Sequence, residues 1–516
     1  MKKFGLCAAF SAALLLGCAG AAYAADSDIM VTKAPMVTKA PAAPATCTSL
    51  WDFVATACPL TWYGITVYGI VDVGGGYQTH GAPFDPNFVT GASYFMQKMN
   101  REPMWGLAPS GLSQSSIGVR GFEPITPNVA FIFDWNAGFD PYSLRFANSP
   151  GSEVANIGLP VAAQTTNGDS SRAGQWYNNV GYIGLSSPTY GTLTVFRQQN
   201  FSNEIGVLQY DPMGGSYAFS PIGFSGVVGG GGDTQNARYS TSVKYFVTAS
   251  MFHAGALAQF GGYDLNNGTS GAYEGNIGAK FQNVGPGTLS LDGIVGWNKD
   301  AVTITLTQPG ADILASGVPT PYPQYLSATI SNNTNVMLLA KYAVGPATLY
   351  AGFQWMQFAP PSDLQTQFTD VSGFTVTGSA AGPLSTASTN GITAINNVAY
   401  TTGCAAGVNC GDKILDAYWA GVKYAVTKDV TVIGAYYHYW QNQFAVTAPV
   451  GYCNTATGHS QCSGTMDAAS AVIDWQFAPK WDTYIGTFYS RFDGGLANGY
   501  LTRNNLATTA GLRFRF

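Results

Sequence analysis

Charged residues are scarce in this sequence. They make up 10% of its 516 residues, whereas soluble domains contain roughly 25%. Beyond the N-terminal segment, the chain also lacks any run of the ~20 apolar residues that a membrane-spanning helix needs. Glycine and aromatic residues are abundant instead, with 63 glycines and 13% Phe, Trp and Tyr together. A chain of this composition without spanning helices is typical of a transmembrane β-barrel.

Motifs for catalysis and cofactor binding are also lacking. The four histidines lie far apart, at His80, His253, His438 and His459. No serine stands in a nucleophile motif of the kind that hydrolases use. The glycine runs 74–76 and 229–232 lack the lysine and the strand–helix setting of a phosphate-binding loop, and we interpret them as strand kinks or loop tips. We therefore expect no enzymatic activity and no cofactor.

The cysteines do not occur in the CxxC spacing of metal sites. Six of the eight cysteines lie beyond the N-terminal segment and form three close pairs. In an exported protein such pairs indicate disulfides, and the short separations favour bonding within each pair. The expected bonds join Cys47 with Cys58, Cys404 with Cys410, and Cys453 with Cys462. Metal binding is the competing interpretation, but only His459 near the last pair supports it, so we expect no metal site.

The N-terminus predicts export. Lys2 and Lys3 precede an apolar run, and Ala22, Tyr23 and Ala24 form a signal-peptidase site. We interpret residues 1–24 as a signal peptide, with a lipoprotein cleavage box ending at Cys18 as the alternative.

A proline- and alanine-rich segment follows at residues 25–61. It contains the hexapeptide MVTKAP twice, at 30–35 and 36–41. Such segments do not form a core and tend to be extended. We predict a periplasmic tether, which is either a plain spacer or an attachment to the cell wall through Lys33 and Lys39.

Alternating apolar and polar residues dominate the remaining chain, residues 62–516. The last stretch shows the pattern clearly, because Leu506, Leu512, Phe514 and Phe516 share one parity while arginines occupy the other. Sixteen such stretches are predicted as strands: 64–77, 114–123, 128–139, 176–187, 191–199, 236–247, 250–263, 272–282, 287–298, 335–344, 347–358, 414–426, 429–441, 467–477, 482–493 and 506–516.

The connections between these stretches alternate in length. Connections after even-numbered strands are tight and rich in Pro and Gly, whereas those after odd-numbered strands are mostly long. Outer-membrane barrels have this arrangement, with the apolar parity outward. The predicted fold class is all-β, a 16-stranded antiparallel transmembrane β-barrel with short periplasmic turns, long outer loops and both termini in the periplasm.

Several motifs then suggest a family. They are VYGIVD at 67–72, SIGVRGFE at 116–123, YIGL at 182–185, YGTLTVFRQ at 190–198, DPMG at 211–214, RYSTSVKY at 238–245 and the terminal Phe516. In this order and spacing the chain resembles the general Gram-negative porins, which are trimeric, sixteen-stranded outer-membrane channels. The tether, the large loops and the paired cysteines depart from that family and suggest a divergent member.

The resemblance implies a constriction inside the barrel. It assigns residues 200–235 as the loop that folds inward, carrying three acids, Glu204, Asp211 and Asp233. Basic wall residues would face this loop at Arg120, Arg197, Arg238 and Lys244. Acids opposite bases produce a transverse field that orients solutes and selects ions.

Each of these charges has a plainer interpretation. Any of them could be an ordinary solvated residue of the lumen, and Asp211 could belong to a simple Asp-Pro turn. Arg197 has the parity of Leu193 and Val195, so its side chain reaches the lumen only if a β-bulge intervenes.

The expected function is passive diffusion of small hydrophilic solutes and ions. A substrate-selective channel and a non-conducting surface adhesin or structural barrel are the alternatives. The expected partners are outer-membrane lipid, further copies of the chain in a homotrimer, the barrel-assembly machinery through Phe516, and the cell wall through the tether. We expect no nucleic-acid partner.

Overall fold

The computed structural model describes most of the predicted strands and parts of their connections. The described residues are 47–81, 102–142, 144, 179–222, 238–260, 271–299, 303–308, 324–329, 332–359, 366–368, 376–378, 392–395, 398–399, 411–444, 453, 462–497 and 502–516.

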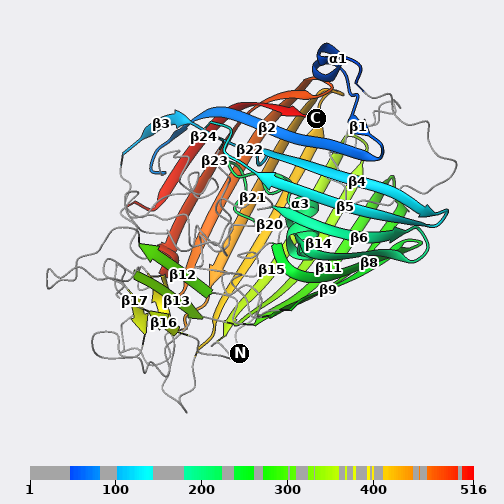
Figure 1. Cartoon of the computed structure of the whole chain (residues 1–516). Helices are drawn as coiled ribbons and strands as arrows, with labels where there is room; N and C mark the ends of the chain where they lie inside the picture. The colour runs from blue at the N-terminus through cyan, green and yellow to red at the C-terminus, as the bar shows by residue number, and fades with distance from the viewer. Residues whose placement is uncertain are drawn as a thin grey trace.

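The largest sheet has 18 strands, all paired antiparallel. Two of them, β1 (Leu60–Trp62) and β3 (Met104–Leu107), are short additions beside β2. The other sixteen form the barrel, which closes where β2 pairs with β24. They are β2 (Ile65–Gln78), β4 (Ser116–Thr126), β5 (Val129–Gly138), β6 (Val180–Ser187), β7 (Gly191–Gln199), β8 (Arg238–Ala249), β9 (Phe252–Phe260), β10 (Gly271–Val284), β11 (Gly287–Lys299), β14 (Asn332–Val344), β15 (Ala347–Ala359), β20 (Lys413–Ala425), β21 (Val430–Gln441), β22 (Gly464–Ala478), β23 (Trp481–Gly494) and β24 (Asn504–Arg515). These sixteen strands confirm the predicted fold (Figure 1).

Smaller elements lie in the connections. One three-stranded sheet contains β12 (Thr303–Gln308), β13 (Gln324–Thr329) and β16 (Thr366–Phe368), and another contains β17 (Val376–Gly378), β18 (Ile392–Ile395) and β19 (Val398–Ala399). The described helices are α1 (Leu50–Ala55), η3 (Ser202–Val207), α3 (Leu208–Tyr210) and η6 (Gly495–Ala497). None of the helices within the described residues is long and apolar enough to cross a membrane.

The two faces of the barrel wall differ in polarity, as the alternation predicted. Ile277 and Leu338 on the outer face are 69% and 58% exposed, whereas Asn335 and Gln354 on the inner face are at most 1% exposed. Side chains of a strand alternate between its two faces, so each strand contributes residues to both the outer and the inner face of the wall. The apolar face therefore points away from the barrel interior, which is the reverse of a soluble sandwich.

The tight turns gather at one end of the barrel. Gly285, between β10 and β11, and Gly345, between β14 and β15, have φ angles of +58° and +53°. Glycine adopts this left-handed conformation at little cost, so it suits these turns. Helix α1 and the C-terminus lie at this same end, while β12, β13 and β16 lie at the opposite end (Figure 1).

Two strands contain irregularities that change which face a residue occupies. In β7 the pairing with β8 shifts between Phe196 and Gln198, and Phe196 has a φ of +86°. In β8, Thr241 has a φ of +49°. Strict alternation with Val243 and Tyr245 predicts that Tyr239 lies on the outer face. That prediction is wrong, because Tyr239 is buried and its hydroxyl donates to Asn298 Oδ1.

The segment before the barrel is folded where it is described. Residues 47–61 were predicted to be part of an extended tether, and for these residues that prediction is wrong, because they contain helix α1 and a disulfide between Cys47 and Cys58. The disulfide closes a short loop and the helix shortens the chain, so the segment does not extend. Residues 1–46 lie outside the described residues.

The structure contains two of the three predicted disulfides. Cys47 is bonded to Cys58, and Cys453 is bonded to Cys462. Both bonds match the predicted pairing of cysteines that are close in sequence. Cys404 and Cys410, the third predicted pair, both lie outside the described residues. The structure therefore does not test the bond between Cys404 and Cys410, which stays a prediction from the sequence.

Candidate functional site

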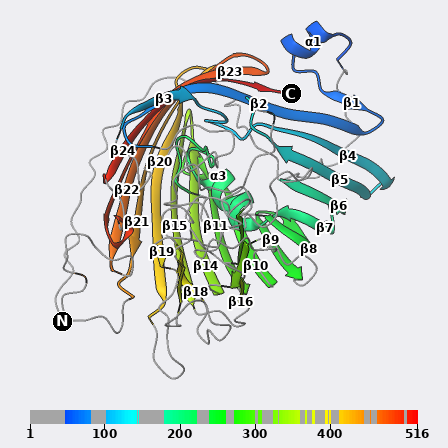
Figure 2. The same cartoon turned by 60° about the vertical axis from the view of Figure 1, so that its left-hand side comes forward.

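The connection after β7 enters the barrel. It begins at Asn200 and continues through η3 and α3, and it is described as far as Ile222. Figures 1 and 2 show α3 enclosed by the barrel wall in both views. This is the first part of the predicted inward loop 200–235, and we call residues 200–222 the inner loop.

A buried glutamate of the wall holds the start of the inner loop. Glu274 on β10 accepts hydrogen bonds from the backbone N–H groups of Phe201 and Ser202 and from the Ser202 hydroxyl. Asn335 Nδ2 on β14 donates to the same hydroxyl at 2.8 Å. Several hydrogen bonds to one buried carboxyl group fix where the chain leaves the wall, because losing them would leave buried polar groups without partners.

Three further strands hold the tip of the inner loop. The Tyr210 hydroxyl donates to Asp292 Oδ2 on β11 at 2.5 Å, and Trp419 Nε1 on β20 donates to the Tyr210 carbonyl at 2.9 Å. The Tyr437 hydroxyl on β21 donates to Asp211 Oδ1 at 2.7 Å. Burial raises the pKa of both Tyr210 and Asp211 above their ordinary values.

The last described part of the inner loop contacts the far side of the barrel. Ala218 N–H and the Ser216 hydroxyl both donate to the Gly111 carbonyl, at 2.9 and 2.7 Å. The Phe219 ring lies edge-on to Tyr484 of β23, with centroids 6.0 Å apart. The inner loop therefore crosses the lumen from β10 to the segment that follows β3.

Apolar packing covers one face of the inner loop. Its residues Ile205, Val207, Met213, Phe219 and Ile222 are all buried in one hydrophobic cluster. The same cluster contains inward-facing wall residues of β14, β15, β20, β21 and β22, among them Met337, Met356, Trp419, Ile433 and Met466. The inner loop and these strands therefore share one apolar cluster inside the barrel.

A cavity of about 470 Å³ lies between the inner loop and the wall, and Ile205, Val207 and Ile222 of the cluster also border it. Its wall side is formed mainly by β2 and β4–β8. The acidic and basic residues in its lining are Arg120, Asp134, Glu204, Arg238 and Lys244.

The wall charges of the cavity are arranged by strand register. Arg120 on β4 is paired with Asp134 on β5, and its guanidinium lies 5.0 Å from the centre of the Tyr68 ring. The Tyr68 hydroxyl donates to Asp134 Oδ1 at 2.5 Å. Further toward the long-loop end, Arg238 Nε donates to Asn179 Oδ1 at 2.6 Å. Arg120 and Arg238 therefore offer two fixed cations to the cavity.

One acid of the inner loop meets a base of the wall directly. Lys244 Nζ on β8 forms an ion pair with Glu204 Oε2 and also donates to the Gln199 carbonyl at 3.1 Å. The ammonium lies 5.3 Å from the centre of the Phe201 ring. The pair bridges the loop and the wall at the margin of the cavity, so the two charges largely neutralise each other.

The structure brings together four of the seven charges singled out in the sequence. Arg120, Arg238, Lys244 and Glu204 line the same cavity. Arg197 is 3% exposed, so its side chain points inward, as the bulge beside it requires, but it is not part of this lining.

The other two acids lie elsewhere. Asp211 is not among the lining residues, because its carboxylate is buried and accepts hydrogen bonds from Tyr437 and from the N–H groups of Met213 and Gly215. It stabilises the inner loop rather than facing the cavity. Asp233 lies outside the described residues.

The sequence analysis missed the residues that partner these charges. Alternation with Phe131, Phe133 and Trp135 predicts that Asp134 faces inward. Its position beside Arg120 follows only from the pairing of β4 with β5. Tyr68, Tyr182 and Asn179 also line the cavity. Period-2 parity gives the face of each side chain, whereas proximity requires the register between strands.

Comparison with known proteins identifies the family. A sequence model described as Gram-negative porin matches residues 9–495. The chain belongs to the Gram-negative porin family. This porin matches no curated protein. Among solved structures, the anion-selective porin from Comamonas acidovorans aligns with a TM-score of 0.51 at 15% identity, covering 88% of this chain and 99% of that one.

Two other solved structures align less well. Salmonella typhi OmpF in complex with daunomycin gives a TM-score of 0.46 at 13% identity, covering 88% of the porin and 97% of OmpF. A trimer form of Vibrio cholerae OmpT gives 0.46 at 13% identity, covering 88% and 99%. Family membership and the barrel together place the porin in the outer membrane as a channel.

Proposed function

We propose that the porin lets small hydrophilic solutes and ions diffuse passively past the inner loop, with a preference for anions. The observation that carries this proposal is the charge around the cavity. Three cationic side chains, Arg120, Arg238 and Lys244, face two anionic ones, Asp134 and Glu204, so the described lining carries a formal charge of +1. A net positive lining favours anions in a narrow, water-filled passage.

With the Lys244–Glu204 pair neutralised, Arg120, Arg238 and Asp134 remain, so the two arginines exceed the carboxylate by one positive charge. A charge about 5 Å from a passing ion contributes about 0.8 kcal/mol even in bulk water, which corresponds to roughly a fourfold change in ion occupancy. Salt reduces this effect, and the lower dielectric of a confined passage increases it. Selectivity of this kind is modest, as passive diffusion requires.

The test is the reversal potential of the reconstituted porin in a planar bilayer under a salt gradient. Arg120→Ala with Arg238→Ala should shift the reversal potential toward cation preference. Lys428→Ala is the matched control, because Lys428 lies in the turn between β20 and β21 with 83% of its side chain exposed. An unchanged reversal potential in the double variant, or an equal shift in the control, would contradict the proposal.

One observation favours a second candidate, a closed structural barrel. Apolar residues of the inner loop share one buried cluster with Met337, Met356 and Met466 of the wall, and apolar filling is what a plug would use. Conductance distinguishes the two. Current steps that grow with salt concentration support the channel. A correctly folded barrel without conductance would support the closed structural barrel, whose function would then lie in the outer loops.

The remaining proposals concern assembly and position. We propose that the porin forms a homotrimer, as expected from its family, and current steps arriving in threes would support this.

Residues 1–24 and 25–46 keep their interpretation as signal peptide and periplasmic tether, with Lys33 and Lys39 as the candidate cell-wall attachment. Phe516 remains the proposed signal for the barrel-assembly machinery. We propose no chemical reaction for this chain.

We also propose a disulfide between Cys404 and Cys410 in the connection before β20. The support is their close spacing in the sequence, which they share with the two pairs that are bonded in the structure. Peptide mapping of the unreduced porin tests it, because a bonded pair yields one linked peptide whose mass rises by about 2 Da on reduction. Free thiols at both positions in the exported porin would contradict this proposal.

A further inference from the structure

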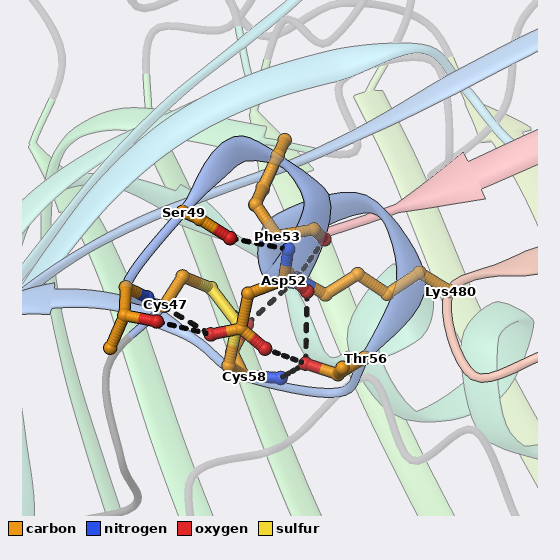
Figure 3. The surroundings of a disulfide bond; sticks show 8 residues. Cys47, Ser49, Asp52, Phe53, Thr56, Cys58 and Lys480 are labelled. Carbon is orange, nitrogen blue, oxygen red and sulfur yellow. Dashed lines mark hydrogen bonds between the residues drawn. A yellow bond between two sulfur atoms is a disulfide. The ribbon is translucent and has the colours of Figure 1, made fainter.

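A small folded unit lies against the outer face of the barrel where the barrel closes. Residues 47–62, which we call the seam clasp, contain helix α1, the Cys47–Cys58 disulfide and strand β1. Ser49 caps the helix by accepting a hydrogen bond from Asp52 N–H, and Asp52 accepts hydrogen bonds from Thr48 N–H and Thr56 Oγ1 (Figure 3). The clasp therefore has its own internal order.

Strand β1 completes the sheet edge that the C-terminal strand leaves open. β24 pairs with β2 only from Ile70 onward, and Phe516 adds two backbone hydrogen bonds to Gly69. β1 pairs with Ile65, Thr66 and Val67 instead. Without β1 these residues of β2 would present an unpaired edge, which is a site for another strand to add.

Helix α1 covers the aromatic end of the C-terminal strand. The Phe53 ring lies edge-on to both Phe514 and Phe516, with centroids 5.6 and 5.5 Å away. Phe514 also lies 4.4 Å from the Trp481 ring. Phe514 and Phe516 belong to the outward, apolar parity of β24, so Phe53 occupies the face that a partner binding this strand end would contact.

The turn before β23 fastens the clasp in this position. Lys480 Nζ donates to the carbonyls of Phe53 and Cys58, at 2.8 and 2.7 Å, and lies 4.4 Å from the centre of the Phe53 ring (Figure 3). Trp481 Nε1 donates to the Val54 carbonyl at 3.0 Å. The two sides of this contact are separated by 427 residues in the chain, so they meet only once the last strands are in place.

We propose that the seam clasp closes over the end of β24 after the barrel has formed and shields Phe514 and Phe516 from any partner that binds an aromatic C-terminal strand. The disulfide holds the docking residues in one loop, which lowers the entropy of the open clasp. Its formation transfers two electrons and two protons from the thiols of Cys47 and Cys58 to a disulfide oxidant, which leaves as a dithiol.

The proposal predicts that the clasp controls access to the last residue. Folded full-length porin is treated with a carboxypeptidase that removes C-terminal aromatic residues, and the loss of Phe516 is followed by intact mass. Replacing both Cys47 and Cys58 by Ser should increase the release rate roughly tenfold. Replacing Cys453 and Cys462 by Ser is the matched control, because it removes a disulfide that is not part of the clasp.

A second pair of variants separates docking from the disulfide. Phe53→Ala should also accelerate release of Phe516, whereas Trp51→Ala should not, because the Trp51 side chain is 78% exposed on the same helix. If the cysteine variant fails to fold, folded wild-type porin is reduced and alkylated before digestion. Equal release rates before and after reduction, or equal acceleration in the control variants, would overturn the proposal.

Discussion

Removal of one hydroxyl group should loosen the inner loop without harming the barrel. Tyr437 lies on β21 with its side chain buried in the lumen, and its hydroxyl donates to Asp211 Oδ1 at 2.7 Å. Tyr437→Phe keeps the ring and its packing but removes this donor. The Asp211 carboxylate then retains the backbone N–H groups of Met213 and Gly215.

The expected cost follows from the burial of this carboxylate. Asp211 is fully enclosed, and burial has already raised its pKa. A hydrogen bond contributes about 0.5–1.5 kcal/mol between neutral groups and about 1.5–3 kcal/mol to a charged group, so we expect a loss of about 1–2 kcal/mol. That difference raises the population of the detached loop by about 5- to 30-fold. The barrel strands keep all their own hydrogen bonds, so their stability should be unchanged.

Single-channel recording is the assay, because a detached inner loop moves into the cavity beside it. Tyr437→Phe should increase the frequency of brief partial closures by about the same factor as the detached population. Tyr436→Phe is the matched control. Tyr436 is the neighbouring residue of the same strand, but it is 51% exposed on the outer face, where its hydroxyl donates to Asp467.

Two outcomes would refute this reasoning. Closures that are equally frequent in Tyr437→Phe and wild-type porin would show that the hydroxyl does not hold the loop. A similar increase in Tyr436→Phe would show that loss of any tyrosine hydroxyl on β21 disturbs the channel. Heat-dependent unfolding in detergent, read as a mobility shift on a gel, checks that each variant forms the same barrel.

Two further predictions concern the end of the barrel where β24 meets β2. The hydrogen bond from Thr48 N–H lowers the pKa of Asp52, so its contribution to the clasp is present above the ordinary carboxyl pKa of ~3.9 and is lost as the pH falls through the folded value. Hydrogen exchange of the α1 amides, corrected for intrinsic pH dependence, should show this loss in wild-type porin but not in Asp52→Asn. Asp482 is buried between two arginines of β24, with Arg513 Nε 2.9 Å away. Asp482→Asn should destabilise the barrel by ~3 kcal/mol, because both arginines lose their nearest carboxylate and, among the described residues, only the ion pair with Asp474, 3.4 Å from Arg513, remains. The temperature of unfolding in detergent should fall accordingly, and an unchanged temperature would contradict the inferred role of Asp482.

Most of the barrel could be predicted because its two signals are local. Period-2 alternation identifies a strand, and Gly or Pro at a tight turn identifies its end, as Gly285 and Gly345 illustrate. Neither signal depends on distant residues. The bounds of a strand are less certain than its existence. For β24 the predicted range 506–516 and the observed range Asn504–Arg515 differ by two residues at one end and one at the other.

The errors arise where one residue changes the phase of the alternation. Thr241 in β8 has a positive φ, which is unfavourable for a β-branched residue and leaves no sequence signal. The phase error placed Tyr239 on the wrong face. The bulge beside Phe196 could be suspected only because a charged residue, Arg197, otherwise faced the membrane. A bulge can therefore be predicted from the sequence where strict alternation would place a charged residue on the membrane face. It cannot be predicted where alternation would place a tyrosine there.

The path of the inner loop could not be predicted from the loop itself, but the wall contains a signal for it. Inward-facing positions of β14, β15 and β22 include Met337, Met356 and Met466, and all three are buried. Inward-facing positions of β4 and β8 include Arg120 and Lys244, which line the cavity. Apolar side chains do not face water across half a lumen without a cover, so the apolar half of the wall marks where the loop lies. The charged half marks the passage that remains. The wall sequence thus places the channel off-centre, beside the strands that follow β2.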